Sequence, residues 1–345
     1  MAEKCVKPDR EYSYDNIKFV LIFLVVFAHL LEVNGAFNGK DQLYKVIYSF
    51  HMPMFIFLSG YFARYSRQKI AFSFVYTYIL MQILYSAFKY YVLTQEPAEP
   101  FSLNFTTPYW LLWYLLALIF FYLLIPFFRQ SDRRKQALVL TVLFTVSLLF
   151  GFDRTIGYYF SLARFFSFLP FFVLGMYMKD RSKEIEEFIK SKSLKAFLLS
   201  FLLSAVLIAA VLFLCRNTRI QASMMYGSKA YSEEFGLVEK LQINVVALLW
   251  IAFIVLVFQR FVHFRIPVIS CIGKNTFPIF LLHGFAVKMA GKLGLLNING
   301  EGNLRKTLLY TVVLVLLLGN PAVNFCFKWI FTGEWLKRLW ARLGR

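Results

Sequence analysis

The sequence has few charged residues for its length. Asp, Glu, Lys and Arg make up 17% of the 345 residues, whereas a soluble domain carries about 25%. Long runs between the charge clusters are almost uncharged, and the longest polar stretches lie near 180–195 and 216–240. Stretches this short cannot bury a core of their own. We therefore expect one transmembrane domain over residues 1–345 and no soluble domain.

Cysteine is also scarce, and the common signatures of metal and nucleophile sites are absent. Cys5, Cys215, Cys271 and Cys326 form no CxxC pair, and three of them lie in or next to apolar segments. We interpret them as small apolar residues. HExxH, GxSxG and Walker sequences are missing. We expect no metal site.

Acidic residues are half as numerous as basic ones, 19 against 38, which gives a net charge of +19. In a soluble protein this excess would suggest nucleic acid. Here the basic residues fall on alternate loops, as the positive-inside rule describes. We therefore expect membrane lipids as partners and no nucleic acid.

Hydrophobic residues are abundant, at 59% of the chain. A run of about 20 apolar residues spans a bilayer as a helix. Such segments occur at 17–34, 43–63, 71–93, 108–128, 136–152, 156–178, 194–215, 241–262, 269–290 and 308–331. The sequence predicts an all-α, polytopic membrane protein with about ten spans.

The distribution of Lys and Arg predicts the orientation of these spans. If the N-terminus is cytoplasmic, the cytoplasmic segments hold 22 Lys and Arg and the external loops hold 10. Cytoplasmic loops carry this excess in membrane proteins. We predict that both termini are cytoplasmic and that loops 94–107 and 216–240 are external.

Ionisable residues inside the spans are the candidate functional residues, because each is unfavourable in lipid unless it has partners. The first span carries Asp15 and Lys18 near its cytoplasmic end and His29 and Glu32 in its outer half. Each pair is three residues apart and so shares a helix face.

The separation of Lys18 and His29 suits a coenzyme A thioester. Eleven residues of helix rise about 16 Å, which is of the order of an extended pantetheine arm. Lys18 could meet the phosphates while His29 meets the thioester. The alternatives are a headgroup anchor for Lys18 and a hydrogen bond between helices for His29.

Three further polar residues lie in later spans. His51 stands at the external end of the second span, Arg164 lies in the sixth, and His283 lies deep in the ninth. His29, His51 and His283 fall at similar depth, which predicts a shared polar chamber. An interfacial role for His51 and a structural ion pair for Arg164 remain open.

Several of these residues belong to motifs that resemble the membrane acyltransferase-three family, and its fucose 4-O-acetylase-like branch in particular. The motifs cover nearly the whole chain in order. They are Asp15, Lys18 spaced from His29 by ten residues, HMPMFIFLSG at 51–60, LWYLLAL at 112–118, FLPFFVLG at 168–175 and GKNTFPIFLLH at 273–283.

The resemblance implies an O-acyltransferase in the bacterial cytoplasmic membrane. Such an enzyme moves an acyl group, here expected to be acetyl, from cytoplasmic acyl-CoA to a hydroxyl of an extracytoplasmic or lipid-linked carbohydrate. The family motif maps its catalytic signature onto Lys18 and His29. Many relatives carry Arg at the Lys18 position, so bidentate phosphate binding is not carried over.

Roles follow for the candidate residues. His29 is expected to act as a general base or as the acyl carrier, with Glu32 orienting it. Lys18, Asp15 and Lys274 are expected to hold coenzyme A. His51, Arg164 and His283 are expected to line the chamber, and no permanently bound cofactor is expected.

Two other classes of function remain open at this point. Intramembrane Arg and His also suit a transporter of a glycan or lipid-linked sugar, which broken helices in paired halves would favour. A receptor or scaffold would use the polar residues only to hold helices together. The sequence leaves the acceptor sugar and the oligomeric state undetermined.

Overall fold

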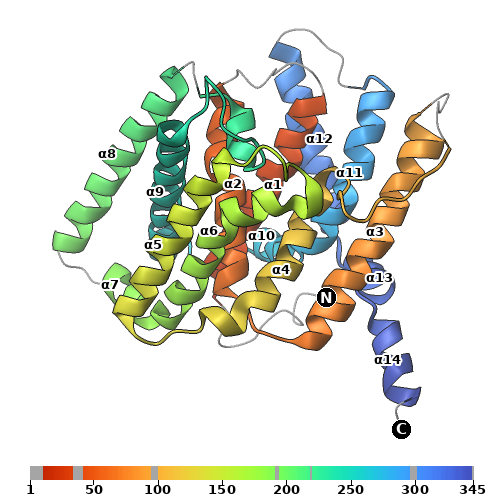
Figure 1. The fold of residues 1–345 in the computed structure, drawn as a ribbon, viewed down its shortest axis with the longest axis horizontal. Helices are drawn as coiled ribbons and strands as arrows, with labels where there is room; N and C mark the ends of the chain where they lie inside the picture. The colour runs from red at the N-terminus through yellow and green to blue at the C-terminus, as the bar shows by residue number, and fades with distance from the viewer. Residues whose placement is uncertain are drawn as a thin grey trace.

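The structure is a computed structural model, and it describes residues 11–33, 42–94, 100–190, 194–217, 220–295 and 301–343. Within these ranges the chain is helical and contains no strand (Figure 1). Cys5 and parts of the predicted loops 35–45, 94–107, 216–240 and 291–307 lie outside the described residues.

The helices follow one another along the chain, with the longest connections before α4 and before α9. They are α1 (Tyr12–Val33), α2 (Gln42–Tyr61), α3 (Tyr76–Ala87), α4 (Trp113–Phe128), α5 (Arg133–Leu149), α6 (Leu162–Asp180), α7 (Ser182–Lys190), α8 (Leu194–Arg216), α9 (Leu237–Phe261), α10 (Pro267–Lys274), α11 (Thr276–Lys292), α12 (Glu301–Leu318), α13 (Pro321–Phe331) and α14 (Glu334–Leu343). Wider π-helical turns, Lys69–Val75 and Phe88–Leu93, extend α3 at both ends.

Each apolar segment predicted from the sequence lies on a helix or on a pair of helices. Among the described residues, six helices are long and apolar enough to cross a membrane, and two bent pairs raise the number to as many as eight. α2 and the shorter apolar part of α8, Leu198–Phe213, are not among them. The all-α, multi-pass fold is confirmed, whereas ten spans and the orientation stay predictions.

The ninth and tenth predicted segments are broken, although continuous helices were expected. α10 and α11 meet at 82°, and α12 and α13 meet at 64°. Pro278 explains the first break, because its ring clashes with the carbonyl four residues earlier and it has no N–H to donate. Pro321 begins α13 after the second break, and the Asn320 side chain caps that helix by accepting from the Ala322 N–H.

Close backbone contacts hold the helices around the site. α2 packs against α6, where a Cβ added at Gly60 would lie 1.9 Å from the Phe172 carbonyl oxygen. A residue without a side chain at position 60 is what permits this close helix contact. Gly273 of α10 packs in the same way on the backbone of Asp15 in α1, where a Cβ would lie 1.8 Å from the Asp15 carbonyl oxygen.

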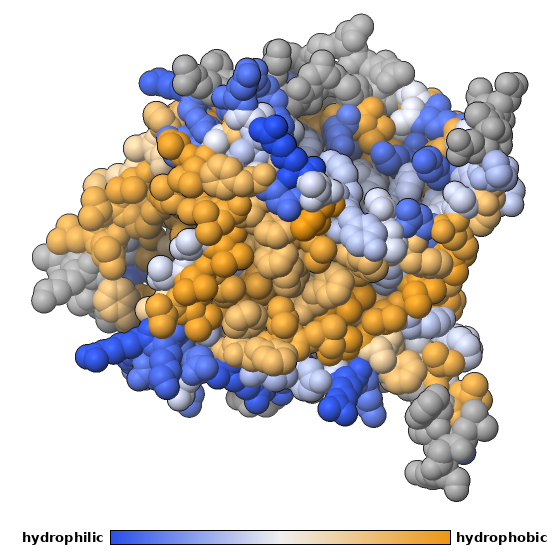
Figure 2. Space-filling model, in the orientation of Figure 1, coloured by the Kyte–Doolittle hydropathy of each residue, from blue (hydrophilic) through white to orange (hydrophobic). Residues whose placement is uncertain are grey.

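The molecule has two polar faces with an apolar band between them (Figure 2). We call the face where α1 begins and α14 lies the terminal face (Figure 1). There Glu11 accepts hydrogen bonds from Lys179, at 2.9 Å, and from the Tyr61 hydroxyl. We call the opposite face, formed by the end of α1 and the segment 220–236, the loop face. α1 runs between these two faces through the middle of the bundle, in contact with α2, α9, α10, α11 and α12.

Candidate functional site

The two histidines of α1 and α11 form a direct pair. Nδ1 of His29 lies 2.9 Å from Nε2 of His283, and their rings are nearly parallel, at 3°. Nδ1 of His283 lies 2.9 Å from the Ile279 carbonyl oxygen. The bend between α10 and α11 changes the direction of α11, and the fully buried side chain of His283 lies against α1.

The hydrogen bonds assign the tautomers of this pair. A carbonyl oxygen only accepts, so Nδ1 of His283 carries the proton and donates it to Ile279. In the neutral ring Nε2 of His283 then accepts the Nδ1–H of His29. Nε2 of His29 is left with a free lone pair, as a general base requires.

A cavity of about 290 Å³ opens beside His29 on the loop face. It brings together four of the predicted site residues, His29, Glu32, His51 and Arg164, while His283 lies behind His29. Its remaining walls are formed by Val25, Tyr48, Met52, Pro108, Trp110, Leu111, Trp113, Tyr158, Phe168, Met225, Tyr226 and Phe280.

His51 and Glu32 occupy different positions relative to His29. His51 is buried, and its Nδ1–H donates to the Ile47 carbonyl oxygen at 2.8 Å within its own helix. Glu32 is exposed at the end of α1 and lines the same cavity. The hydrogen bond at Nδ1 of His29 is made with His283 and not with Glu32.

Arg164 is held by aromatic rings and a carbonyl group. Its guanidinium carbon lies 5.0 Å from the Trp113 ring centroid and 5.2 Å from that of Tyr158, and its Nε donates to the Tyr226 carbonyl oxygen at 3.2 Å. Within the described part of the chain no carboxylate oxygen comes within 4.0 Å of it. Aromatic faces stabilise a guanidinium without neutralising it, so its charge remains directed at the cavity.

Segment 220–236 covers this cavity at the loop face. It supplies Tyr226, whose hydroxyl lies 3.0 Å from that of Tyr44 in α2. Burial raises the pKa of the Tyr226 phenol. The phenol therefore stays protonated at neutral pH and remains a hydrogen-bond donor.

Trp110 has a strained backbone, with φ of 37°. Its ring centroid lies 4.6 Å from that of His29, and Nζ of Lys288 lies 4.2 Å from the Trp110 ring centroid. Non-glycine residues adopt positive φ rarely, and such strain is concentrated at functional sites. Here it keeps the indole ring beside His29.

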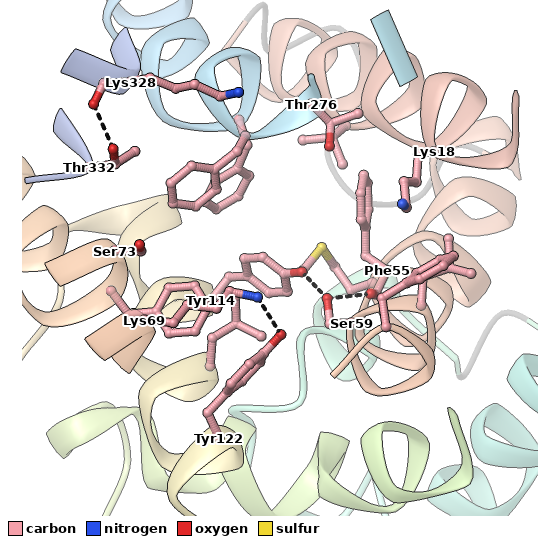
Figure 3. A pocket seen from close by; sticks show the side chains of 18 residues that line it. Lys18, Phe55, Ser59, Lys69, Ser73, Tyr114, Tyr122, Thr276, Lys328 and Thr332 are labelled. Carbon is pink, nitrogen blue, oxygen red and sulfur yellow. Dashed lines mark hydrogen bonds between the residues drawn. The ribbon is translucent and has the colours of Figure 1, made fainter. Parts of the chain in front are cut away.

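A second cavity, of about 430 Å³, lies toward the terminal face. Three lysines from separate helical segments line it, namely Lys18, Lys69 and Lys328 (Figure 3). Its other walls are mostly apolar and aromatic, with a few hydroxyl groups. They are formed by Val25, Met52, Phe55, Leu58, Ser59, Phe62, Ser73, Phe74, Tyr114, Leu118, Tyr122, Thr276, Phe277, Phe280 and Thr332.

Lys18 is oriented by two neighbours. Its Nζ lies 3.9 Å from Oδ1 of buried Asp15 and 4.1 Å from the ring centroid of Phe62. Asp15 therefore stands behind Lys18 and does not line the cavity. Lys274 is exposed at the end of α10 and is also absent from this wall, although Thr276 and Phe277 belong to it.

Lys69 and Lys328 were not among the site residues predicted from the sequence. Nζ of Lys69 donates to the Tyr122 hydroxyl at 3.0 Å (Figure 3). Both lysines stand at or near segment ends, where an interfacial anchor is the ordinary expectation. They differ from ordinary interfacial anchors only in that they line one cavity together with Lys18, which lies far away in the sequence.

The two cavities share part of their walls. Val25, Met52 and Phe280 line both of them. We call the cavity lined by Lys18, Lys69 and Lys328 the lysine cavity and the one lined by His29 and His51 the histidine cavity; the two meet at these three shared side chains. Lys18 lines one cavity and His29 the other, and about 16 Å of helical rise separates them on one helix.

Comparison with known proteins gives a family match and two partial relatives. The model of a family described as acyltransferase domain matches residues 11–319. The nodulation protein NolL of Sinorhizobium fredii is 40% identical over 60 residues, which is 16% of this chain and 16% of the relative. NolL of Mesorhizobium japonicum is 41% identical over 58 residues, 15% of each chain. No solved structure matches.

Proposed function

Because this chain belongs to the acyltransferase family whose model spans residues 11–319, and is thus a multi-pass membrane acyltransferase, we propose the following reaction. The protein moves an acetyl group from cytoplasmic acyl-CoA to a hydroxyl of an extracytoplasmic or lipid-linked carbohydrate. The observation that carries the proposal is the meeting of the lysine and histidine cavities at Val25, Met52 and Phe280.

The donor enters from the terminal face, which is cytoplasmic in the predicted orientation. Coenzyme A carries several phosphate charges, and Lys18, Lys69 and Lys328 offer three ammonium groups to them. The long apolar wall of this cavity suits the pantetheine arm. Asp15 orients Lys18 from behind.

The transfer takes place where the two cavities meet. The acceptor hydroxyl lies in the histidine cavity, where Nε2 of His29 takes its proton and the oxygen attacks the thioester carbonyl carbon. The carbon–sulfur bond then breaks, and the coenzyme A thiolate takes the proton back from His29. The products are the ester and free coenzyme A.

The alternative chemistry has His29 as acyl carrier. Nε2 of His29 would attack the thioester carbonyl carbon and expel the coenzyme A thiolate. The acceptor hydroxyl would then take the acyl group from the ring, its proton would pass to that thiolate, and Nε2 would regain its lone pair. Both routes use the same lone pair, and His283 supports both by holding Nδ1–H of His29. Arg164, Tyr226 and His51 surround the acceptor as polar groups.

The two matches to the NolL proteins cover only 15 to 16% of each relative, so the carbohydrate acceptor is part of the proposal and not taken from them. A transporter remains the alternative. A transporter would be indicated by broken helices at corresponding positions in the two halves of the chain. The two bent pairs among the described residues are instead consecutive and lie in the C-terminal part.

The test is release of coenzyme A thiol from acetyl-CoA by the purified protein. An enzyme of this mechanism releases thiol in step with acyl transfer to an acceptor, and slowly to water without one. A transporter or scaffold leaves acetyl-CoA intact. Absence of thiol release with a full range of glycan acceptors would overturn the proposal.

A further inference from the structure

A third cavity, of about 180 Å³, lies on the loop face and does not include His29. Its walls come from the last turn of α5, from the α5–α6 connection, from α6, from segment 227–231 and from the first turn of α9. The lining residues are Ser147, Phe150, Gly151, Asp153, Arg154, Gly157, Ala163, Ser167, Gly227, Ser228, Lys229, Ala230, Tyr231 and Lys240. No role in the transfer reaction has been given to it above.

Lys240 is the buried cation of this cavity. The residue is only 7% exposed, and its Nζ donates to Oγ of Ser167 at 3.1 Å. Ser167 in turn donates to the Gly227 carbonyl oxygen at 2.9 Å. Across the described residues no carboxylate oxygen lies within 4.0 Å of Lys240.

A buried ammonium with no counter-charge is energetically unfavourable. An ammonium has three N–H groups, and Ser167 accepts from one of them. An anion in the cavity would therefore both neutralise the charge and accept the remaining donors.

The rest of the cavity is also positive. Arg154 and Lys229 line it at exposed positions, and Asp153 is its acidic residue. Oδ1 of Asp153 accepts from the backbone N–H groups of Thr155 and Ile156, at 2.8 and 3.0 Å. Asp153 thus stabilises the local turn, and the three cations outnumber it.

This cavity adjoins the histidine cavity through a thin wall. Arg164 and Tyr226 line the histidine cavity, whereas the neighbouring Ala163 and Gly227 line this one. The wall is tightly packed, because a Cβ added at Gly227 would lie 2.6 Å from Cε2 of Phe168. Residues adjacent in the sequence, Ala163 with Arg164 and Tyr226 with Gly227, therefore line the two cavities.

We propose that the Lys240 cavity binds an anionic group, a carboxylate or a phosphate, of the acceptor while the reacting hydroxyl enters the histidine cavity. The cavity would select acidic acceptors over neutral ones and fix their orientation. Only the identity of the bound molecule as an acceptor rests on the proposed function. Anion binding itself does not depend on catalysis.

The test measures anion binding to the purified full-length protein in detergent. Thermal unfolding is followed with glucuronate, inorganic phosphate or neutral glucose at constant ionic strength. We expect glucuronate or phosphate to raise Tm saturably and glucose to have no such effect. Lys240→Met should weaken that binding roughly tenfold or more, as expected for loss of a charge-assisted hydrogen bond.

The chain offers a matched control in Lys45, which is also buried. Its Nζ donates to the Asn217 carbonyl oxygen at 3.2 Å, and it does not line the cavity. Lys45→Met should keep the anion response. The double variant Arg154→Gln with Lys229→Gln, at exposed positions, should weaken binding a few-fold even if Lys240→Met does not fold.

The outcomes separate the ligand classes and the two proposals. A response to glucuronate alone supports a carboxylate, a response to phosphate alone supports a phosphate, and His29→Gln should bind either one like the parent. If the parent protein binds the anion but transfers no acyl group, the proposed reaction is wrong and the anion site still stands. The absence of a saturable anion response in the parent, or an unchanged response in both the Lys240 and the double variant, overturns the anion site.

Discussion

Nδ1 of His29 lies 2.9 Å from Nε2 of His283, a residue 254 positions later in the chain. The Ile279 carbonyl fixes the tautomer of His283, and His283 fixes that of His29. The pair thus presents an unprotonated Nε2 of His29 at the cavity.

His29→Ala and His29→Gln should abolish acyl transfer. A general base contributes about 10²–10⁴-fold in rate, and glutamine has no titratable nitrogen to replace it. Acyl-CoA binding should persist, because the lysine cavity is unchanged. Single-turnover transfer and an acyl-CoA dissociation constant check both points. Transfer near the parent rate in either variant would show that His29 only packs.

His283→Phe should lower kcat by roughly 10–100-fold, by analogy with the loss seen when a hydrogen-bond partner that orients a metal-ligating imidazole is removed. Phenylalanine keeps the ring volume but cannot accept the Nδ1–H of His29. His283→Gln restores an acceptor near the position of Nε2 and should recover much of the rate. Equal activity of the Phe and Gln variants would argue against a positioning role.

The acyl-CoA dissociation constant distinguishes this effect from misfolding, since it should be the same in the parent and in both His283 variants. His51→Gln serves as the control inside the same cavity. His51 donates to the Ile47 carbonyl oxygen of its own helix and not to His29. The difference in kcat between a Phe and a Gln substitution that is expected at His283 should therefore not be seen at His51.

Lys18→Ala, Lys69→Ala and Lys328→Ala should each weaken acyl-CoA binding. Loss of one hydrogen bond to a charged group is worth about 1.5–3 kcal/mol, or roughly 10–150-fold in affinity. Lys18→Arg should keep most of the binding, because the charge remains. Titration of the purified protein with acyl-CoA measures this directly.

Lys274→Ala is the matched control for the three lysines, because Lys274 is exposed and lies outside the cavity wall. Its affinity for acyl-CoA should be close to that of the parent. A large loss with Lys274→Ala, and none with Lys69→Ala or Lys328→Ala, would move the donor site away from this cavity.

The loop face should be external and the terminal face cytoplasmic. The motive is the charge bias of 22 to 10 between the predicted cytoplasmic and external segments. Ser102→Cys and Ser232→Cys, both at exposed loop positions, should react with an impermeant thiol reagent in intact cells. Ser131→Cys should react only after lysis, and the reverse pattern would invert the topology.

The sequence by itself determined the helices and part of the site. Long apolar runs must form helices in lipid, because the backbone has no other hydrogen-bond partner there. Helical spacing alone also puts Lys18 and His29 at opposite ends of one span. A small residue inside a span, such as Gly60, is typical of a close helix contact, and here a side chain at that position would prevent the approach of Phe172.

Only the tertiary structure decided which residues meet. Helical periodicity is a local property, whereas the faces that pack together depend on contacts between distant segments. For that reason the sequence could place His283 in one chamber with His29, but it named Glu32 and not His283 as the residue that orients His29. It likewise named Lys274, and not Lys69 or Lys328, as a lysine acting together with Lys18. The break at Asn275 turns α11 by 82° relative to α10 and brings His283 to His29. An apolar run in the sequence predicts that a helix forms but not the angle at which it is bent.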